Sequence, residues 1–449
     1  MSASWTLSLF LCAPLAGAAG PAQDAESAPE TLWIRAERVI VRPGVELERA
    51  TLRIEEGVIV AVGEDLTVPE GAEVVEAPVA CAGFIDPWSA VGLDRSSAED
   101  RGTVASTRTV DALDPFRRPH ERTEALQAGV TSARVQAGRL SMVGGVGAVV
   151  SVDPSTDSAV LLEDACVSAT VGVTRGGGSA DVFDRIAEVG RLVGLVKKGE
   201  SYRREQLDYR DELAEWEEAI AEKREELEDD FKKAKKKRDK EIEEAEEDGK
   251  EFKEDKYKED KKPKQPRWDP NLEVMARVAD GELPIVVEVH RVPELRGLLE
   301  DTEDLDRLRM IVAGATEAAH LAEQLADRDI SVLLWPTPEV TGRSEYARHD
   351  LALAGELERA GVEVLLGSGG RAHARDLRLL AALAVGHGLD AEAALHAITL
   401  GPARAFDVAD RVGSLERGKV ADVLLFDGDP LDTTARLQHV VSRGRVVER

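Results

Sequence analysis

The chain has 449 residues with a formal net charge of −28 at pH 7, and hydrophobic residues make up 43% of it. This length and apolar content suffice for one large domain with a smaller companion. The strong negative charge argues against a nucleic-acid partner, because binding to the phosphate backbone depends on a positive protein surface. We therefore expect an acidic, well-solvated surface.

The first 18 residues have the features of an export signal. An apolar run over residues 5–15 precedes Ala16-Gly17-Ala18, a small-any-small cleavage site, and the run is too short to span a bilayer. We expect a signal peptide over residues 1–18, a flexible leader over 19–30, no transmembrane span, and a periplasmic or extracellular location. The two cysteines that remain after cleavage, Cys81 and Cys166, are expected to be buried free thiols.

Short strand-like runs lie at both ends of the chain. Near the start they are separated by turn signals such as Pro43-Gly44, which indicates a small antiparallel sheet. Similar runs follow at residues 421–427 and 440–447. We expect the two chain ends to build one β domain together.

Apolar strands alternate with helical segments through the middle of the chain. The strands are expected at residues 130–135, 164–173, 283–290, 308–313, 330–335 and 362–366, with a glycine-rich hairpin at 142–152. Near-continuous apolar strands separated by helices indicate a parallel sheet, which a (β/α) barrel would close. An open doubly wound sheet is the alternative.

Residues 197–264 are dominated by charged side chains and predict a long solvated helix or helical hairpin. A narrow apolar seam, spaced as in a coiled coil, would suit one helical partner. The seam consists of Tyr209, Leu213, Trp216, Ile220, Leu227 and Ala234. The segment is either a solvated spacer or an arm for docking or dimerisation.

The run Gly83-Phe84-Ile85-Asp86 resembles the strand that carries the first metal-binding motif of the amidohydrolase superfamily. The tail of the chain, residues 399–407 and 411–430, resembles the closing helix of that family and its return into the β domain. Residues 111–116, 128–131 and 144–148 are similar to the imidazolonepropionase-like branch. The resemblance covers most of residues 31–449 apart from the charged segment.

The resemblance implies an α/β fold, in which a TIM-like (β/α)8 barrel is inserted into a small β-sandwich domain built from both chain ends, with a long charged helical insertion. The expected parts are the β domain at 31–80 and 413–449, the barrel at 81–196 and 267–412, and the insertion at 197–266.

The resemblance also identifies the positions where active members hold a divalent metal, which makes a bound water nucleophilic. The expected His-any-His pair falls on Trp88 and Ala90, which offer no metal ligand. The last expected ligand, an Asp, falls on Gly369. His290 occupies a ligand position, and Asp86 and Glu288 are more distant candidates, so the pattern indicates a lost metal site.

Three functions remain open at this point. The first is an exported non-catalytic family member without a cofactor, which acts as a binding or partner subunit in a homo-oligomer or in a hetero-oligomer with a related amidohydrolase. The second is an active hydrolase of cyclic amides or small peptides with an atypical or single-zinc site at His290. The third is a small-molecule binding protein that uses the former substrate pocket.

Overall fold

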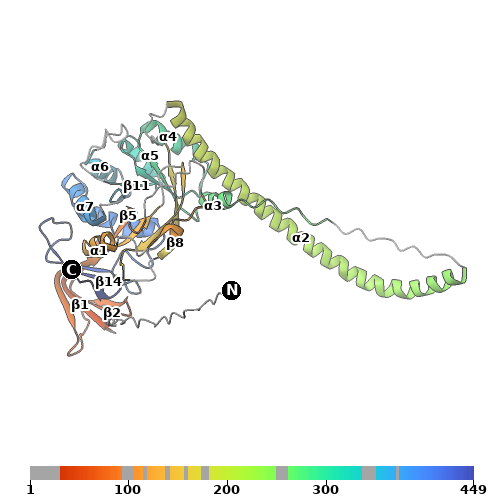
Figure 1. Cartoon of the computed structure of the whole chain (residues 1–449), viewed down its shortest axis with the longest axis horizontal. Coiled ribbons are helices and arrows are strands. Elements are labelled where there is room, and N and C mark those ends of the chain that lie inside the picture. Colours follow the sequence, from red (N-terminus) through yellow and green to blue (C-terminus); the bar gives the residue numbers. More distant parts are fainter. Residues whose placement is uncertain are drawn as a thin grey trace, which may run out of the picture.

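The computed structural model describes residues 31–93, 105–114, 119–136, 142–155, 160–172, 182–248, 261–335, 350–370 and 374–448, with side chains omitted over 224–248. The expected signal peptide and leader lie outside these residues. In the described part no helix is long and apolar enough to cross a membrane. The molecule consists of a small sheet, a barrel surrounded by helices, and one helix that projects far from both (Figure 1).

The small sheet is built from both ends of the chain, as the sequence predicts. Its seven strands lie in the order β15-β14-β13-β4-β1-β2-β3. They are β1 (Thr31–Arg42), β2 (Val45–Glu55), β3 (Val58–Gly63), β4 (Val74–Ala82), β13 (Val423–Phe426), β14 (Leu437–Ser442) and β15 (Arg445–Val446).

This sheet contains both parallel and antiparallel strand pairs, and it curves strongly. The expectation of a purely antiparallel N-terminal sheet is wrong, because β1 and β4 pair in parallel across the connection through β2 and β3. An antiparallel bridge joins Val58 in β3 to Val420, just before β13. The β3 edge of the sheet therefore meets the segment that leads into β13, and the sheet encloses a separate apolar core that includes Ile34, Leu52 and Val423.

The barrel sheet contains eight strands in the order β12-β11-β10-β9-β8-β7-β6-β5. They are β5 (Phe84–Ser89), β6 (Val130–Val135), β7 (Val143–Ser151), β8 (Val160–Thr170), β9 (Ile285–Val289), β10 (Met310–Gly314), β11 (Ser331–Leu334) and β12 (Val364–Leu366). This arrangement agrees with the predicted barrel rather than with an open sheet.

Two features of the barrel differ from the expectation. Residues 142–152 form one strand instead of a hairpin, and this strand, β7, pairs antiparallel with both β6 and β8. The link between Val135 and Val143 is too short for a crossover helix, so the chain must turn back directly. The glycines that suggested a turn lie at shifts in strand register, and Gly145 lets the Thr107 carbonyl approach within 2.3 Å of where a Cβ would stand.

Helices surround the barrel (Figure 1). They are α1 (Pro119–Gln127), α3 (Pro270–Ala279), α4 (Val292–Asp301), α5 (Ala322–Asp327), α6 (Leu353–Arg359), α7 (Leu377–Gly386), α8 (Ala391–Ala397) and α9 (Leu400–Ala405), with 3-10 turns at Thr109–Ala112, Ala318–Leu321 and Ala374–Asp376. Alternate strand residues face the helices and form the largest apolar cluster, whereas the others face the lumen.

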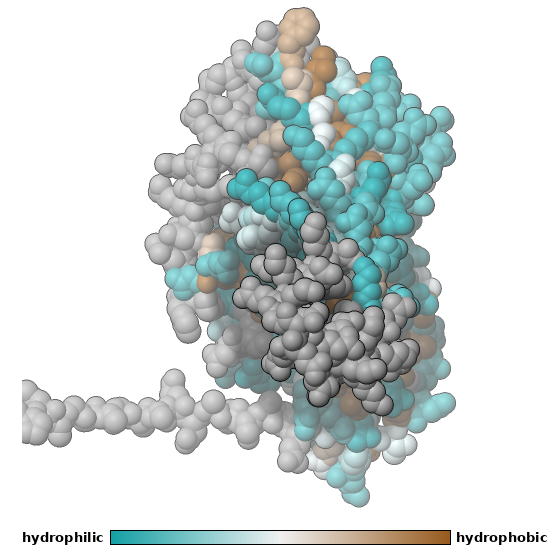
Figure 2. Space-filling view, turned by 90° about the vertical axis from the view of Figure 1, so that its right-hand side faces the viewer, coloured by the Kyte–Doolittle hydropathy of each residue, from teal (hydrophilic) through white to brown (hydrophobic). Residues whose placement is uncertain are grey.

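The projecting helix α2 (Val182–Asp248) has 67 residues and is about 100 Å long. It begins 15 residues before the expected start at residue 197. The reason is packing: Val189, Leu192, Val193 and Val196 are buried in the main core, so the first turns cover the barrel before the charged part departs from it. Seen along this arm, most described surface residues are hydrophilic (Figure 2).

Candidate functional site

Asp86 closes the barrel between its first and last strands. Its Oδ1 atom accepts hydrogen bonds from the Ser368 and Trp88 backbone N–H groups at 3.0 and 3.1 Å, and Oδ2 accepts one from the Ser368 hydroxyl at 2.6 Å. Burial raises the pKa of this carboxyl, and the hydrogen bonds from Ser368 and Trp88 offset part of that rise. Asp86 therefore joins β5 to the end of β12, and both its oxygens are already engaged in the fold.

Trp88 fills the lumen at the end of β5. Its side chain is 4% exposed, and its ring centroid lies 5.0 Å from that of Trp335 at the end of β11. Gly367 faces Trp88 so closely that a Cβ there would lie 2.8 Å from the Trp88 Cβ. Gly369, at φ +81°, supports Trp335 in the same way, because a Cβ there would stand 3.3 Å from the Trp335 ring. The glycines after β12 thus make room for two indole rings.

Arg134, at the end of β6, is the largest fully buried side chain of the lumen. Its guanidinium lies 5.2 Å from the centre of the Trp88 ring and 5.4 Å from that of Phe406. It donates hydrogen bonds to neutral acceptors: the Cys166 Sγ at 3.1 Å, the Pro87 carbonyl at 3.3 Å, the Ser168 hydroxyl at 2.6 Å, and the Gln136 amide oxygen. A cation and two indole rings thus occupy the upper part of the barrel.

His290 lies just beyond the end of β9 and is 2% exposed. Its Nε2 atom is 3.5 Å from the Glu288 Oε1 atom, and its ring meets Trp335 edge-on with centroids 6.2 Å apart. Gly314 at the end of β10 is required by this ring, since a Cβ there would lie 2.4 Å from His290 Cε1. The structure therefore brings His290 and Glu288 together, as their shared strand face predicts.

Gly314→Ala is expected to destabilise the protein by about 1–3 kcal/mol, because it combines a positive φ with a collision against a buried ring. Gly361→Ala is the matched control. Its φ of +86° is as unfavourable, yet the nearest atom to a new Cβ would be 3.9 Å away. Urea unfolding of both variants measures the difference. Equal losses would show that the contact with His290 contributes nothing.

Among the described residues, the candidate metal positions do not bring three metal ligands together. Ala90, which directly follows β5, is half-buried. Neither Ala90, Trp88 nor Gly369 has a side-chain atom that could bind a metal ion. In the part of the chain that the structure describes, no three His, Cys, Asp or Glu side chains lie close enough to hold a metal ion. The donors present, His290 with Glu288 and a fully engaged Asp86, do not fit a divalent metal, which needs three or more protein ligands.

Sequence reasoning missed Arg134, Trp335 and Ser368. Trp335 could have been noticed, since it follows Leu333 at the alternate spacing that places both side chains on one strand face. Arg134 lies within a predicted apolar strand, and nothing in the sequence around it indicated that its side chain lies in the barrel lumen. Both cysteines are buried free thiols, as expected, and burial raises the pKa of Cys81 further from the neutral range.

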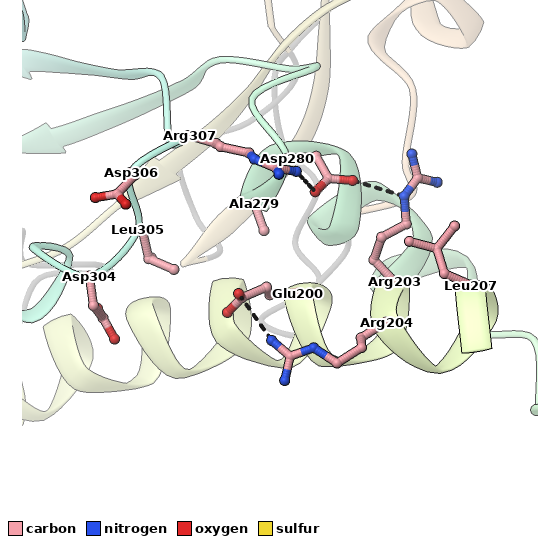
Figure 3. A pocket seen from close by; sticks show the side chains of 10 residues that line it. All are labelled: Glu200, Arg203, Arg204, Leu207, Ala279, Asp280, Asp304, Leu305, Asp306 and Arg307. Carbon is pink, nitrogen blue, oxygen red and sulfur yellow. Dashed lines mark hydrogen bonds and ion pairs between the residues drawn. The ribbon is translucent and has the colours of Figure 1, made fainter.

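A separate hollow of about 320 Å³ lies outside the barrel, where α2 meets the loops before β9 and β10 (Figure 3). Ion pairs cross it: Arg203 contacts Asp280 at 2.8 Å, and Arg307 contacts the same carboxylate at 3.4 Å. Nearby, Lys197 of α2 pairs with Asp304 at 2.8 Å. These contacts anchor the base of the arm, and they are remote from the lumen residues described above.

The model of the amidohydrolase family matches residues 237–447. Over these residues the chain is similar to that family. Its match begins within α2 and covers the second half of the barrel and the returning β strands. No curated protein matches the chain.

Several solved structures share the fold. An amidohydrolase from Thermotoga maritima has a TM-score of 0.70 at 21% identity, covering 93% of this chain and 100% of that one. A molinate hydrolase has a TM-score of 0.53 at 18% identity over 94% of this chain and 95% of that one. A Xaa-Pro dipeptidase with methionine bound in its active site has a TM-score of 0.51 at 12% identity, over 93% of this chain and 100% of that one. At these identities the likeness concerns the fold.

Proposed function

We propose that this amidohydrolase-family protein is exported, has lost the metal site of active members, and acts as a non-catalytic binding or partner subunit. The observation that carries the proposal is the position of Trp88. Where the family resemblance expects the first metal-binding His, an indole is packed inside the barrel against Trp335 and beneath Arg134. A side chain of this size excludes the space that a metal and its water would need.

The charge of Arg134 supports the same proposal. A guanidinium in the lumen would repel a divalent cation, since like charges in a poorly solvated interior interact strongly. Its neutral partners leave the positive charge uncompensated by any carboxylate within ion-pair distance among the described residues. The upper lumen is therefore electrostatically unsuited to a metal as well as sterically filled.

Metal analysis tests the proposal directly. Protein purified without chelators and exchanged into metal-free buffer is expected to retain less than about a tenth of an equivalent of zinc, manganese, iron, nickel or cobalt. His290→Ala should leave this value unchanged. About one equivalent of metal that disappears in His290→Ala would overturn the proposal.

A second candidate is a hydrolase with an atypical single-metal site, and the contact between His290 and Glu288 is the observation in its favour. A carboxylate that orients a histidine is a common arrangement beside metals. This candidate requires stoichiometric metal and turnover of a cyclic amide or dipeptide, both lost in His290→Ala. The same metal analysis thus separates the two candidates.

A partner-subunit role would give the projecting arm a purpose. The family barrel is retained, and a helix of about 100 Å extends from it. We propose that the protein assembles with itself or with a related amidohydrolase. In that assembly a catalytically complete partner would supply the chemistry that this chain lacks.

A further inference from the structure

Part of the apolar seam of α2 is covered by the chain itself. Tyr209, Leu213, Trp216 and Ile220 are half-buried, whereas the residues between them are exposed. One contact on the seam and one at Tyr202, nearer the barrel, identify the segment that lies along this side of α2. The Lys262 ammonium lies 5.9 Å from the centre of the Trp216 ring, and the Tyr202 hydroxyl accepts a hydrogen bond from the backbone N–H of Asp269. The segment before α3 therefore runs back along the arm (Figure 1).

These two contacts also indicate the conformation of the returning segment. Trp216 and Tyr202 are fourteen helical residues apart, which is about 21 Å along the helix. Lys262 and Asp269 are seven residues apart and span the same length, at about 3 Å per residue. This rise is that of an extended chain, either a β-strand or a polyproline II helix.

Burial along the segment distinguishes the two conformations. Pro263, Pro266 and Asp269 are half-buried, and the residues between them are exposed. A period of three is that of polyproline II, whereas a strand would alternate with a period of two. The two prolines, whose φ is fixed near the polyproline value, reinforce this assignment. The arm is thus an α-helix with a polyproline II segment lying along its seam.

The threefold geometry leaves a row of cations on the outside. Lys261, Lys264 and Arg267 share one face of the segment at intervals of about 9 Å. All three are exposed and make no ion pair with any described residue, and no Asp or Glu occurs over residues 261–268. Next to the row, Trp268 exposes 68% of its surface. In a chain with a net charge of −28, this cationic row is a local exception.

We propose that the cationic row of Lys261, Lys264 and Arg267 is a docking site for an extended acidic segment of a partner protein, with Trp268 providing the apolar contact. Carboxylates three residues apart on an extended chain repeat at about 9–10 Å and match the row. This interaction surface goes beyond the proposed function and does not depend on the metal question.

The surroundings of the row favour a narrow partner over a membrane. The adjacent helix exposes Glu205, Asp208, Asp211, Glu212 and Glu215, so a wide anionic surface would meet these carboxylates as well as the cations. An extended segment can lie along the row alone. Lys262 contacts Trp216, about 21 Å along α2 from Tyr202, which is the last buried residue among the described side chains of α2. This end of the row therefore lies more than two Debye lengths from the acidic body at physiological salt.

The test uses the full-length protein and a fluorescein-labelled peptide, (Glu-Pro-Pro)5, whose carboxylates recur at the spacing of the row. We expect a saturable rise in anisotropy that (Gln-Pro-Pro)5 does not give. The triple variant Lys261→Glu, Lys264→Glu, Arg267→Glu should weaken binding by about tenfold or more, because three charge-assisted contacts are reversed.

The matched control reverses three exposed cations elsewhere: Arg296→Glu, Arg417→Glu and Arg436→Glu. It changes the net charge equally and should alter affinity less than about twofold. Equal losses in both triple variants would overturn the proposal in favour of bulk electrostatics. Absence of binding at about 1 mM peptide would also overturn it. So would binding to vesicles with 30% phosphatidylglycerol that exceeds binding to the peptide.

Discussion

Trp88→Ala is expected to destabilise the protein by about 3–5 kcal/mol, the usual cost of removing a large aromatic side chain from a packed interior. The loss should be large because the Trp88 ring centroid lies 5.0 Å from that of Trp335, and the ring also lies beside the Arg134 guanidinium. Trp88 also packs against Gly367, where any side chain would collide with it. The void left behind cannot collapse easily, since strands of a barrel surround it.

Urea unfolding followed by circular dichroism measures this effect. Trp268→Ala is the matched control, because that indole is 68% exposed, and its loss should cost less than about 0.5 kcal/mol. Trp88→Phe should fall between the two, since it keeps an aromatic ring over Gly367. If Trp88→Ala proved as stable as Trp268→Ala, the indole would not be packed in the lumen, and the proposed loss of the metal site would lose its main support.

Stability is expected to fall by about 2.5 kcal/mol as the pH rises from 4 to 7, through the titration of Asp422. Asp422 is buried where the small sheet meets the base of the barrel. Burial raises its pKa from 3.8 to about 6, and hydrogen bonds from the Arg443 backbone N–H and the Thr131 hydroxyl limit the rise.

The direction follows from proton binding. Between pH 3.8 and 6 the unfolded chain releases the proton of this carboxyl while the folded chain retains it, so rising pH favours unfolding. Below 3.8 both states are protonated, and above 6 both are ionised, so the contribution is constant outside this window. The raised pKa of Asp86 acts in the same direction.

Asp422→Asn isolates the effect, because asparagine does not titrate and its oxygen still accepts the Arg443 hydrogen bond. Relative to the wild type, the variant should gain about 2.5 kcal/mol between pH 4 and 7 in urea unfolding. Asp327→Asn, at an exposed position that makes no ion pair with a described residue, should show the wild-type profile. Parallel profiles for the wild type and Asp422→Asn would show that ionisation of this carboxyl does not destabilise the folded protein.

The main architecture was predictable from the sequence because its signals are local. Alternating apolar strands indicated the barrel, turn residues such as Pro43-Gly44 delimited the small sheet, and dense charge predicted the long helix. The resemblance in residues 399–430 linked both chain ends to one β domain. In each case the pattern involves residues close together in the sequence. The periodicity of such residues directly indicates a helix, a strand or a turn.

Elements that depend on closure or on packing were harder to predict. The antiparallel β7 arises because short links forbid crossover helices, and glycine suggested a turn where it permits a close approach. The predicted start of α2 was wrong because its first turns are apolar and are stabilised by packing against the barrel, whereas the prediction relied on the charged residues.

The sequence by itself, through its resemblance to amidohydrolases, predicted that Trp88 and Ala90 stand where two metal ligands are expected and Gly369 where a third is expected. Tertiary structure decided which side chains surround these positions. Trp88, Arg134 and Trp335 come from three strands far apart in the chain, and they meet because the barrel brings alternate side chains of every strand into one lumen. Such a meeting depends on strand order and register, which no local run of residues specifies.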